Sequence, residues 1–327
     1  MKLQEQERCV SKQSPYKWNR VVGAINILVK GANPNGDPDN EGMPRVINRA
    51  NNEFGLISSI CLKKKLRNVL RKYKSEILEI CGLDGKEDNY LLHDSEDGGW
   101  EGKTRKEANQ LLSELTDNEV IERYWDIRVF GGTILEGREK TKPKNKGKKP
   151  KAIESETEPG LESEEGDNKA FTFKRTGCFS VTNPESIGPI DTYTGAITKQ
   201  YTFDATREQG MAPNGIKFVK HGVYHAVFDI SSANAAETHC TEMDIKVLQE
   251  CMKRLFDPDQ SASRPANSMS LINIWAKECE DRFGKGKEEF YEKAIPVLKE
   301  GVVTPTSLND YVFNDLTDLG AYDICKQ

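Results

Sequence analysis

The sequence predicts an α+β protein built on a ferredoxin-like (RRM-like) sheet of the split βαβ type, with insertions. Short β-branched runs typical of strands alternate with two amphipathic helical patterns. Their order along the chain is strand, helix, strands, strand, helix, strand. A chain of 327 residues is long enough to bury one large core, so we expect a single domain over 1–327.

The first strand and the first helix lie near the beginning of the chain. Residues 20–31 are apolar and β-branched and end at a glycine, which predicts a strand. Residues 56–74 predict a helix, because Leu62, Leu66 and Val69 recur at the 3.6-residue period. We expect this stripe to face the core.

The middle of the chain is less regular. Residues 105–124 predict a helix with a break near Thr116, and residues 125–135 predict a strand that kinks at its two glycines. Residues 138–169 predict a flexible charged loop, because a run with seven Lys and no acid is followed by a run with seven acids and no base. This loop is either a solvated surface segment or a basic arm that touches nucleic acid.

The last third returns to regular structure. Residues 215–231 are apolar on both alternating faces, as in a central strand, and residues 268–278 predict another strand. Residues 241–256 predict an amphipathic helix that opens with a capping box from Thr241 to Asp244.

Composition excludes several classes of protein. No apolar run reaches the roughly 18 residues that a membrane span needs, and the N-terminus lacks the apolar stretch of a secretory signal. We therefore expect a cytoplasmic protein without a membrane partner. The eight cysteines are scattered singly, with no CxxC pair, which favours buried reduced thiols over a zinc site. His221 and His225 face the same way on the 215–231 strand, where packed core histidines are more plausible than metal ligands, and we expect no cofactor.

The segment 32–46, ANPNGDPDNEGMPRV, crowds carboxylates, amides, glycines and prolines into one loop. An EF-hand calcium site does not fit, because a strand precedes the loop and Asn48 falls where a bidentate carboxylate is needed. Asp37 and Asp39 would suffice for a hydrated Mg²⁺ against a phosphate, although no third ligand is near in sequence. The alternative is a series of tight turns that presents Arg45 and backbone N–H groups to a ligand.

The predicted helix after this loop is strongly basic. A solvated face would mix signs to gain i,i+4 pairs, whereas a run of like charges suits a phosphate backbone. A partnerless basic face remains the alternative. The aromatic signature of an RNA-recognition motif is absent, so base stacking on the sheet is not supported. The cations between positions 63 and 74 are Lys63, Lys64, Lys65, Arg67, Arg71, Lys72 and Lys74.

Two blocks together carry a resemblance to a known family. The loop NPNGDPDNEGMPRV followed by ICLKKKLRNVL closely resembles the backbone subunit of type I CRISPR Cascade complexes, the Cas-seven family of RAMP proteins, and is similar to its subtype I-C and I-B members. Further similar segments are YWDIRVFGG (124–132), SIGPI (186–190) and DQSASRP (259–265). The resemblance spans about residues 20–275, and Lys64 stands where arginine is common.

The resemblance implies an architecture and an assembly. It implies a ferredoxin-like palm, a helical finger insertion over 75–124 and a thumb-like β-hairpin within 170–214. It implies copies of the chain stacked head to tail along the spacer of one CRISPR RNA, together with other Cascade subunits. The guide bases would then stay free to pair with the protospacer strand of target DNA.

The resemblance also implies roles for individual residues. Asn33, Asn35 and Arg45 would line the guide groove. Lys63, Lys64 and Arg67 would face its phosphates. Arg128 and Arg264 are further candidate RNA contacts, for which a structural ion pair is an equally good interpretation.

Two other functional classes stay open. Backbone subunits of the related type III complexes cut target RNA with a loop aspartate, so a metal-dependent ribonuclease that uses Asp37 and Asp39 is the main alternative to a non-enzymatic subunit. A stand-alone RNA chaperone, which would need no thumb, is the other.

Overall fold

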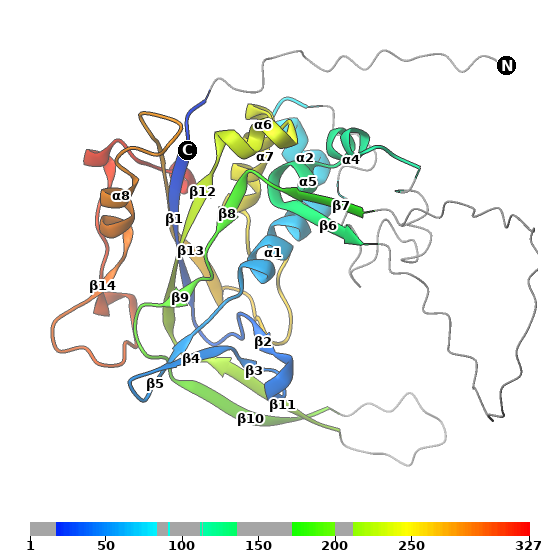
Figure 1. Ribbon diagram of the computed structural model, residues 1–327. Coiled ribbons are helices and arrows are strands. Elements are labelled where there is room, and N and C mark those ends of the chain that lie inside the picture. Colours follow the sequence, from blue (N-terminus) through cyan, green and yellow to red (C-terminus); the bar gives the residue numbers. More distant parts are fainter. Residues whose placement is uncertain (1–17, 84–90, 92–111, 113, 136–171, 200–211) are drawn as a thin grey trace, which may run out of the picture.

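A six-stranded antiparallel sheet forms the centre of the molecule (Figure 1). The computed structural model describes residues 18–83, 91, 112, 114–135, 172–199 and 212–327. The strand order is β16-β13-β1-β12-β8, with β9 also paired to β12. These strands are β1 (Val21–Val29), β8 (Phe179–Val181), β9 (Glu185–Ser186), β12 (Gly222–Ile230), β13 (Met269–Glu278) and β16 (Tyr322–Asp323). The described part of the chain is therefore a mixed α/β structure whose sheets are antiparallel.

Helices cover one face of the sheet. Alternate residues of β1, namely Ile25, Ile27 and Val29, enter one buried cluster with Leu62 and Leu248 from two of these helices. The short helix α5 belongs to the same layer, because Trp125, Val129 and Phe130 join this cluster. The helices are α1 (Ser59–Lys72), α2 (Lys74–Ile80), α5 (Trp125–Phe130), α6 (Ser232–Thr238) and α7 (Glu242–Lys253).

The C-terminal region covers the other face. Val22 and Ala24 of β1 pack with Trp275 of β13 and Phe290 of α8 (Lys287–Ala294). A small hairpin follows α8, made of β14 (Val297–Leu298) and β15 (Tyr311–Val312). The 3₁₀ turns η2 (Leu308–Asp310) and η3 (Thr317–Leu319) complete this region. A last turn, η4 (Ile324–Lys326), packs its Ile324 in the cluster on the helix-covered face.

Three polar side chains cross the sheet as a ladder. The amide Nδ2 of Asn26 on β1 donates to Oδ1 of Asn273 on β13 at 2.8 Å. Oδ1 of Asn26 lies 2.9 Å from Nδ1 of His225 on β12, so that ring nitrogen is the donor. Burial lowers the pKa of His225 from 6.5 to about 4. The imidazole is therefore neutral at physiological pH.

Four predictions about the elements are confirmed. The strands expected over 20–31 and 268–278 are β1 and β13, and the helices expected over 56–74 and 241–256 are α1 and α7. Thr241 and Asp244 form the expected capping box.

The prediction of a strand over 125–135 was wrong in its first half. Trp125–Phe130 is the helix α5, and only Gly131–Leu135 is a strand, β6, which pairs with β7 (Thr172–Thr176). Periodicity does not separate helix from strand in so short an apolar run. Gly131, at φ 73°, ends the helix and starts the strand.

The prediction of one strand over 215–231 was also wrong. β11 (Ala212–Val219) ends before a turn, and β12 begins at Gly222. His221 therefore lies in the turn rather than beside His225 on a shared face. It is buried, at 8 % exposure.

The remaining predictions fall partly or wholly outside the described residues. The charged loop over 138–169 lies outside them, as do most of the finger region and the first half of the helix expected over 105–124. Thr116, where a break was expected, caps α4 (Asp117–Arg123). Within the thumb range, β10 (Thr192–Lys199) pairs with β11. Every helix in the described ranges is too short or too polar to traverse a bilayer.

Candidate nucleic-acid interface

Asp37 and Asp39 build turns in the loop 32–46. Asp37 caps the 3₁₀ turn η1 (Pro38–Asn40), accepting from the N–H of Asp39 at 3.4 Å, and its carboxylate lies 3.5 Å from Nη2 of Arg45. Two short strands, β2 (Gly36–Asp37) and β3 (Met43–Pro44), close the loop. Within the described residues no group of three or more His, Cys, Asp or Glu side chains is placed to hold a metal ion.

The loop is fastened to the first turn of α1. Oδ1 of Asn35 accepts from the backbone N–H of Ser58 at 2.9 Å, and Ser58 is the residue that caps α1. The carbonyl of Asn35 accepts from the N–H of Arg45 at 2.9 Å. Asn35 therefore joins both arms of the loop to the basic helix. The chain reaches α1 through the hairpin of β4 (Val46–Arg49) and β5 (Asn52–Gly55).

Two other segments hold the loop from its far side. The N–H of Asn33 donates to the carbonyl of Ser263 at 2.8 Å. On the β10–β11 hairpin, Nζ of Lys217 donates to the carbonyl of Glu41 at 2.8 Å and lies 3.1 Å from its carboxylate. The loop, α1, the 259–265 turn and the hairpin thus meet in one place.

Two buried polar atoms in this loop lack a hydrogen-bond partner among the residues that the structure describes. Asn33 is 7 % exposed, and its Nδ2 donates to the carbonyl of Gly42 at 2.8 Å, but its Oδ1 has no hydrogen bond. Nε of Arg45 is likewise buried without an acceptor. An unpaired buried polar group costs about 1–3 kcal/mol, so such atoms indicate where a ligand or ordered water completes the bonding.

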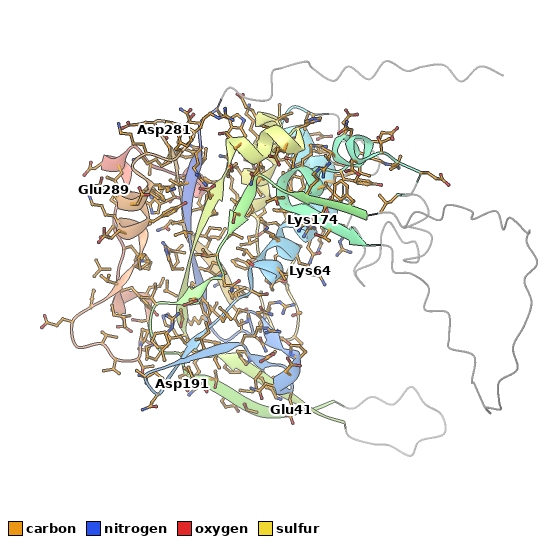
Figure 2. All side chains as sticks on the ribbon, viewed as in Figure 1. Glu41, Lys64, Lys174, Asp191, Asp281 and Glu289 are labelled. Carbon is orange, nitrogen blue, oxygen red and sulfur yellow. The ribbon has the colours of Figure 1, made fainter. Side chains whose placement is uncertain are left out.

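Lys63 and Lys64 are unpaired cations near the start of the basic helix. Lys64 is exposed on the outer side of α1 (Figure 2). The ammonium of Lys63 lies 5.9 Å from the centre of the Phe130 ring, and neither lysine has a hydrogen bond or ion pair in the described part of the chain. Burial, and secondarily the charge of Arg67, lowers the pKa of Lys63. Both ammonium groups are available to an anion.

Arg67 and Lys65 of α1 differ from these two lysines, because each is ion-paired with an aspartate. Nε of Arg67 lies 3.0 Å from the fully buried carboxylate of Asp126, and its guanidinium stacks over Phe130 at 4.7 Å. Lys65 was counted in the basic face, which is wrong: it is buried and paired with Asp259. Its position, three residues after Leu62, places it on the core side of the helix.

Arg128 and Arg264 are both ion-paired. Arg128 binds Asp244 with two nitrogens, at 3.0 and 2.8 Å, and its third donates to the carbonyls of Ile121 and Glu122. Its side chain is 11 % exposed, so it forms the structural ion pair. Arg264 lies 3.0 Å from Asp259 but keeps 30 % exposure beside the carbonyl of Asn33.

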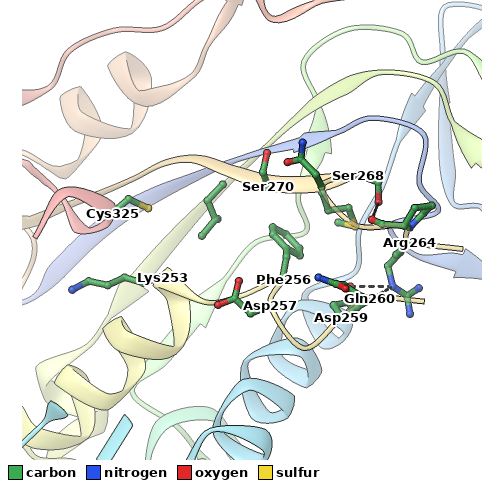
Figure 3. A pocket seen from close by; sticks show the side chains of 13 residues that line it. Lys253, Phe256, Asp257, Asp259, Gln260, Arg264, Ser268, Ser270 and Cys325 are labelled. Atoms are coloured by element: carbon green, nitrogen blue, oxygen red, sulfur yellow. Dashed lines mark hydrogen bonds and ion pairs between the residues drawn. The ribbon is translucent and has the colours of Figure 1, made fainter. Parts of the chain in front are cut away.

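A cleft of about 430 Å³ continues from Arg264 along the start of β13 (Figure 3). Phe256 lies in its middle, and Lys253 lies at the end opposite Arg264. Lys253 is paired with Glu250 at 2.7 Å, and Arg264 with Asp259. Since its cations are neutralised, the cleft is a poorer phosphate site than the outer side of α1.

The family is decided by a match over nearly the whole chain. Residues 19–315 match the model of the family described as "CRISPR-associated protein Cas7". The chain belongs to this family.

Individual relatives of the chain are distant in sequence and structure. No curated protein matches. One solved chain, from a "CRISPR RNA-guided surveillance complex, pre-nicking", is 11 % identical with a TM-score of 0.39, over 79 % of this chain and 78 % of that one. Another, from a "CRISPR RNA-guided surveillance complex", is 10 % identical with a TM-score of 0.36, over 79 % and 68 %. Likenesses this distant carry no argument about the site.

Sequence reasoning missed several residues that shape this Cas7-family site. Asp259 holds Lys65 and Arg264, Ser58 links the loop to the helix, and Lys217 fixes the loop tip. Asp259 begins the DQSASRP segment, so its place five residues before Arg264 was the available signal. Nothing in one sequence indicates the contact of Lys217 with Glu41, which is 176 residues away.

Proposed function

We propose that this Cas7-family chain is a non-catalytic backbone subunit that binds CRISPR RNA in a type I Cascade-like complex. Copies would line up along the guide spacer in the cytoplasm, beside other Cascade subunits, and present the guide for pairing with target DNA. The observation that carries the proposal is the pair of unpaired lysines, Lys63 and Lys64, next to a loop that holds buried, unpartnered polar atoms at Asn33 and Arg45.

The chemistry of this face suits a phosphate–ribose backbone. A subunit that accepts any spacer must hold phosphate and sugar and leave the base edges free. Lysine ammonium groups bind phosphates without reading sequence. We assign Asn33, Asn35, Arg45, Lys63 and Lys64 to the guide groove.

Two predicted contacts take a secondary place in this proposal. Arg67 and Arg264 each keep part of their guanidinium accessible beside the groove, at 16 % and 30 % exposure, while an aspartate holds them. Arg128 we assign to the fold, because Asp244 and two carbonyls take its donors.

We also propose that the central sheet is a ferredoxin-like palm. The strand order β13-β1-β12-β8, with α1 after β1 and α7 after β12, supports this, because a split βαβ repeat places its first and third strands side by side. The β10–β11 hairpin is our candidate for the thumb, and the region of α4 for part of the finger.

The first test reverses the two unpaired lysines. Lys63→Glu/Lys64→Glu should weaken binding of single-stranded RNA about tenfold or more and lower the log–log salt slope by about 1.4, since each single-strand phosphate contact contributes about 0.7. Binding is measured by fluorescence anisotropy over a salt series, with urea unfolding as the check on the fold. Arg67 is left intact, because reversing it would place a Glu against buried Asp126.

The matched control carries the same charge change elsewhere. Lys293→Glu/Lys299→Glu alters two exposed lysines on the C-terminal region, and should leave the salt slope unchanged. On longer RNAs the mass of the wild-type assembly should grow linearly with RNA length, because head-to-tail contacts do not close. An unchanged slope in the Lys63/Lys64 variant, or one fixed assembly size on all RNAs, would contradict the proposal.

A further inference from the structure

Ile60 is an exposed apolar side chain inside the proposed RNA-binding face. It is 78 % exposed, and among the described residues only Phe283, at 84 %, is a more exposed large apolar side chain. Scattered apolar residues on a surface need no explanation by themselves. Ile60 differs in its surroundings, because it stands one helical turn before Lys63 and Lys64 on the same side of α1.

The backbone that carries Ile60 is firmly held. Oδ1 of Asn183 accepts from the N–H of Ser59 at 2.8 Å, and Oγ of Ser58 accepts from the N–H of Cys61 at 3.2 Å. The backbone N–H of Ser58 in turn donates a hydrogen bond to Oδ1 of Asn35 in the loop 32–46. The side chain of Ile60 is thus presented in a fixed direction at the junction of the loop and the basic helix.

We propose that Ile60 is an apolar wedge that packs against a base or ribose of the RNA bound on this face. The inference rests on the proposed function and deepens it, because it names a contact that is not electrostatic. Lys63 and Lys64 attract the phosphates, and a strand held there brings its unstacked bases over the first turn of α1. Every base has an apolar face, so such a contact is tolerant of sequence and can open a step between bases.

Charge argues for RNA as the occupant rather than a protein. The stretch from Ser59 to Lys74 contains no acidic residue, and its first turn adds the positive end of the helix dipole. An apolar patch for a protein partner is usually surrounded by a polar rim and is itself depleted in charged residues. Here the neighbours of Ile60 on the helix are cations, which suits a polyanion with apolar faces.

The separate contributions of Ile60 and of the lysines to RNA affinity can be measured. Ile60→Ala should weaken binding of a short unstructured RNA about fivefold, the loss expected from removing a partly buried aliphatic contact, and should leave the salt slope unchanged. Ile60→Leu, which keeps the apolar volume, should bind within about twofold of wild type. RNAs carrying 2-aminopurine at successive positions should show one position whose fluorescence depends on Ile60.

The control is Phe283→Ala, which removes a similarly exposed apolar side chain from the loop between β13 and α8 and should change none of these readouts. Equal affinity and equal fluorescence for wild type and Ile60→Ala would overturn the wedge while leaving the proposed function intact. RNA binding that fails already in the wild type would overturn both. A loss of binding to another protein in Ile60→Ala, with RNA binding unchanged, would reassign the residue to a protein interface.

Discussion

Two sets of cations on α1, one unpaired and one paired, behave differently. Lys63 and Lys64 have no hydrogen bond or ion pair among the described residues. Lys65, on the core side, and Arg67, one turn after Lys63, are paired with Asp259 and Asp126, at 6 % and 16 % exposure. The run of cations looks uniform in sequence, but its paired members are not available to a ligand as the unpaired lysines are.

The difference shows that a count of positive charges does not measure the capacity to bind RNA. A buried cation whose partner is an aspartate has its charge neutralised and its donors occupied, so removing the partner costs more than the pair contributes. An exposed unpaired lysine contributes little to stability and retains its full attraction for phosphate. Substitutions in the two sets should therefore separate stability from RNA affinity.

The largest effect is expected at Asp244, which forms a buried ion pair with Arg128 of α5 and so resembles the paired cations of α1. Asp244→Ala leaves a buried guanidinium uncompensated and removes the capping box of α7, so the free energy of unfolding should fall by about 3–5 kcal/mol. Urea unfolding measures this. Glu242→Ala, an exposed acid in the first turn of the same helix, is the control and should change stability by less than about 0.5 kcal/mol. A stable Asp244→Ala protein that no longer binds RNA would move Arg128 from the fold to the interface.

Acid pH provides the next test, because it acts on a histidine that is buried in the central sheet, away from the proposed RNA-binding face. The pKa of His225 is about 4 in the folded protein against an ordinary 6.5, so between these values the unfolded chain binds a proton that the folded chain does not. Stability should fall as the pH drops through this window, by about 3 kcal/mol from this group.

Comparison with His225→Gln isolates this contribution from that of the carboxylates. The difference in unfolding free energy between wild type and variant, measured in urea at pH 7 and pH 4, should change by that amount. His225 belongs to the central sheet and not to the proposed RNA-binding face, so the salt slope of RNA binding should be the same at pH 7 and pH 6. A wild-type stability that tracks the variant at every pH would show that the imidazole is not held neutral.

The smallest effect is expected in the loop. Asp37→Ala should cost about 1 kcal/mol, because it removes the hydrogen bond to the N–H of Asp39 and the ion pair with Arg45. Asp39→Ala should cost less, because the Asp39 carboxylate has no hydrogen bond or ion pair among the described residues. We expect no Mg²⁺-dependent cleavage of guide-matched RNA by the wild type, and therefore none to lose. Cleavage by the wild type that disappears in Asp37→Ala would replace the backbone subunit with a ribonuclease.

Local patterns predicted the parts of the fold that depend on neighbouring residues. The stripe Leu62, Leu66 and Val69 gave α1 and its core side, and Thr241 with Asp244 gave the start of α7. The burial of Lys65 could also have been predicted, because Lys65 follows Leu62 by three residues and so lies on the side of this stripe. Our prediction instead placed Lys65 on the basic face because of its charge. The roles of Asn33, Asn35 and Arg45 in RNA binding remain predictions from the resemblance.

What could not be predicted depends on residues far apart in the chain. The carboxylates that neutralise Lys65 and Arg67 come from positions 194 and 59 residues away, so a local sequence pattern could not predict them. The break between β11 and β12 was hidden because apolar residues continue on both sides of it. In α5, six residues are too few for the helical period to be distinguished from a strand.

The polar ladder of Asn273, Asn26 and His225 has a consequence for how the sheet assembles. Alternation of apolar residues penalises a slip of one residue between strands, but a slip of two restores the same faces. Such a slip of β12 along β1 would set Val223 or Val227 opposite Asn26 in place of His225. The amide oxygen would then be buried without a donor, at a cost of about 1–3 kcal/mol. The ladder therefore fixes the strand register, because it destabilises a two-residue slip that the alternation of apolar residues alone would allow.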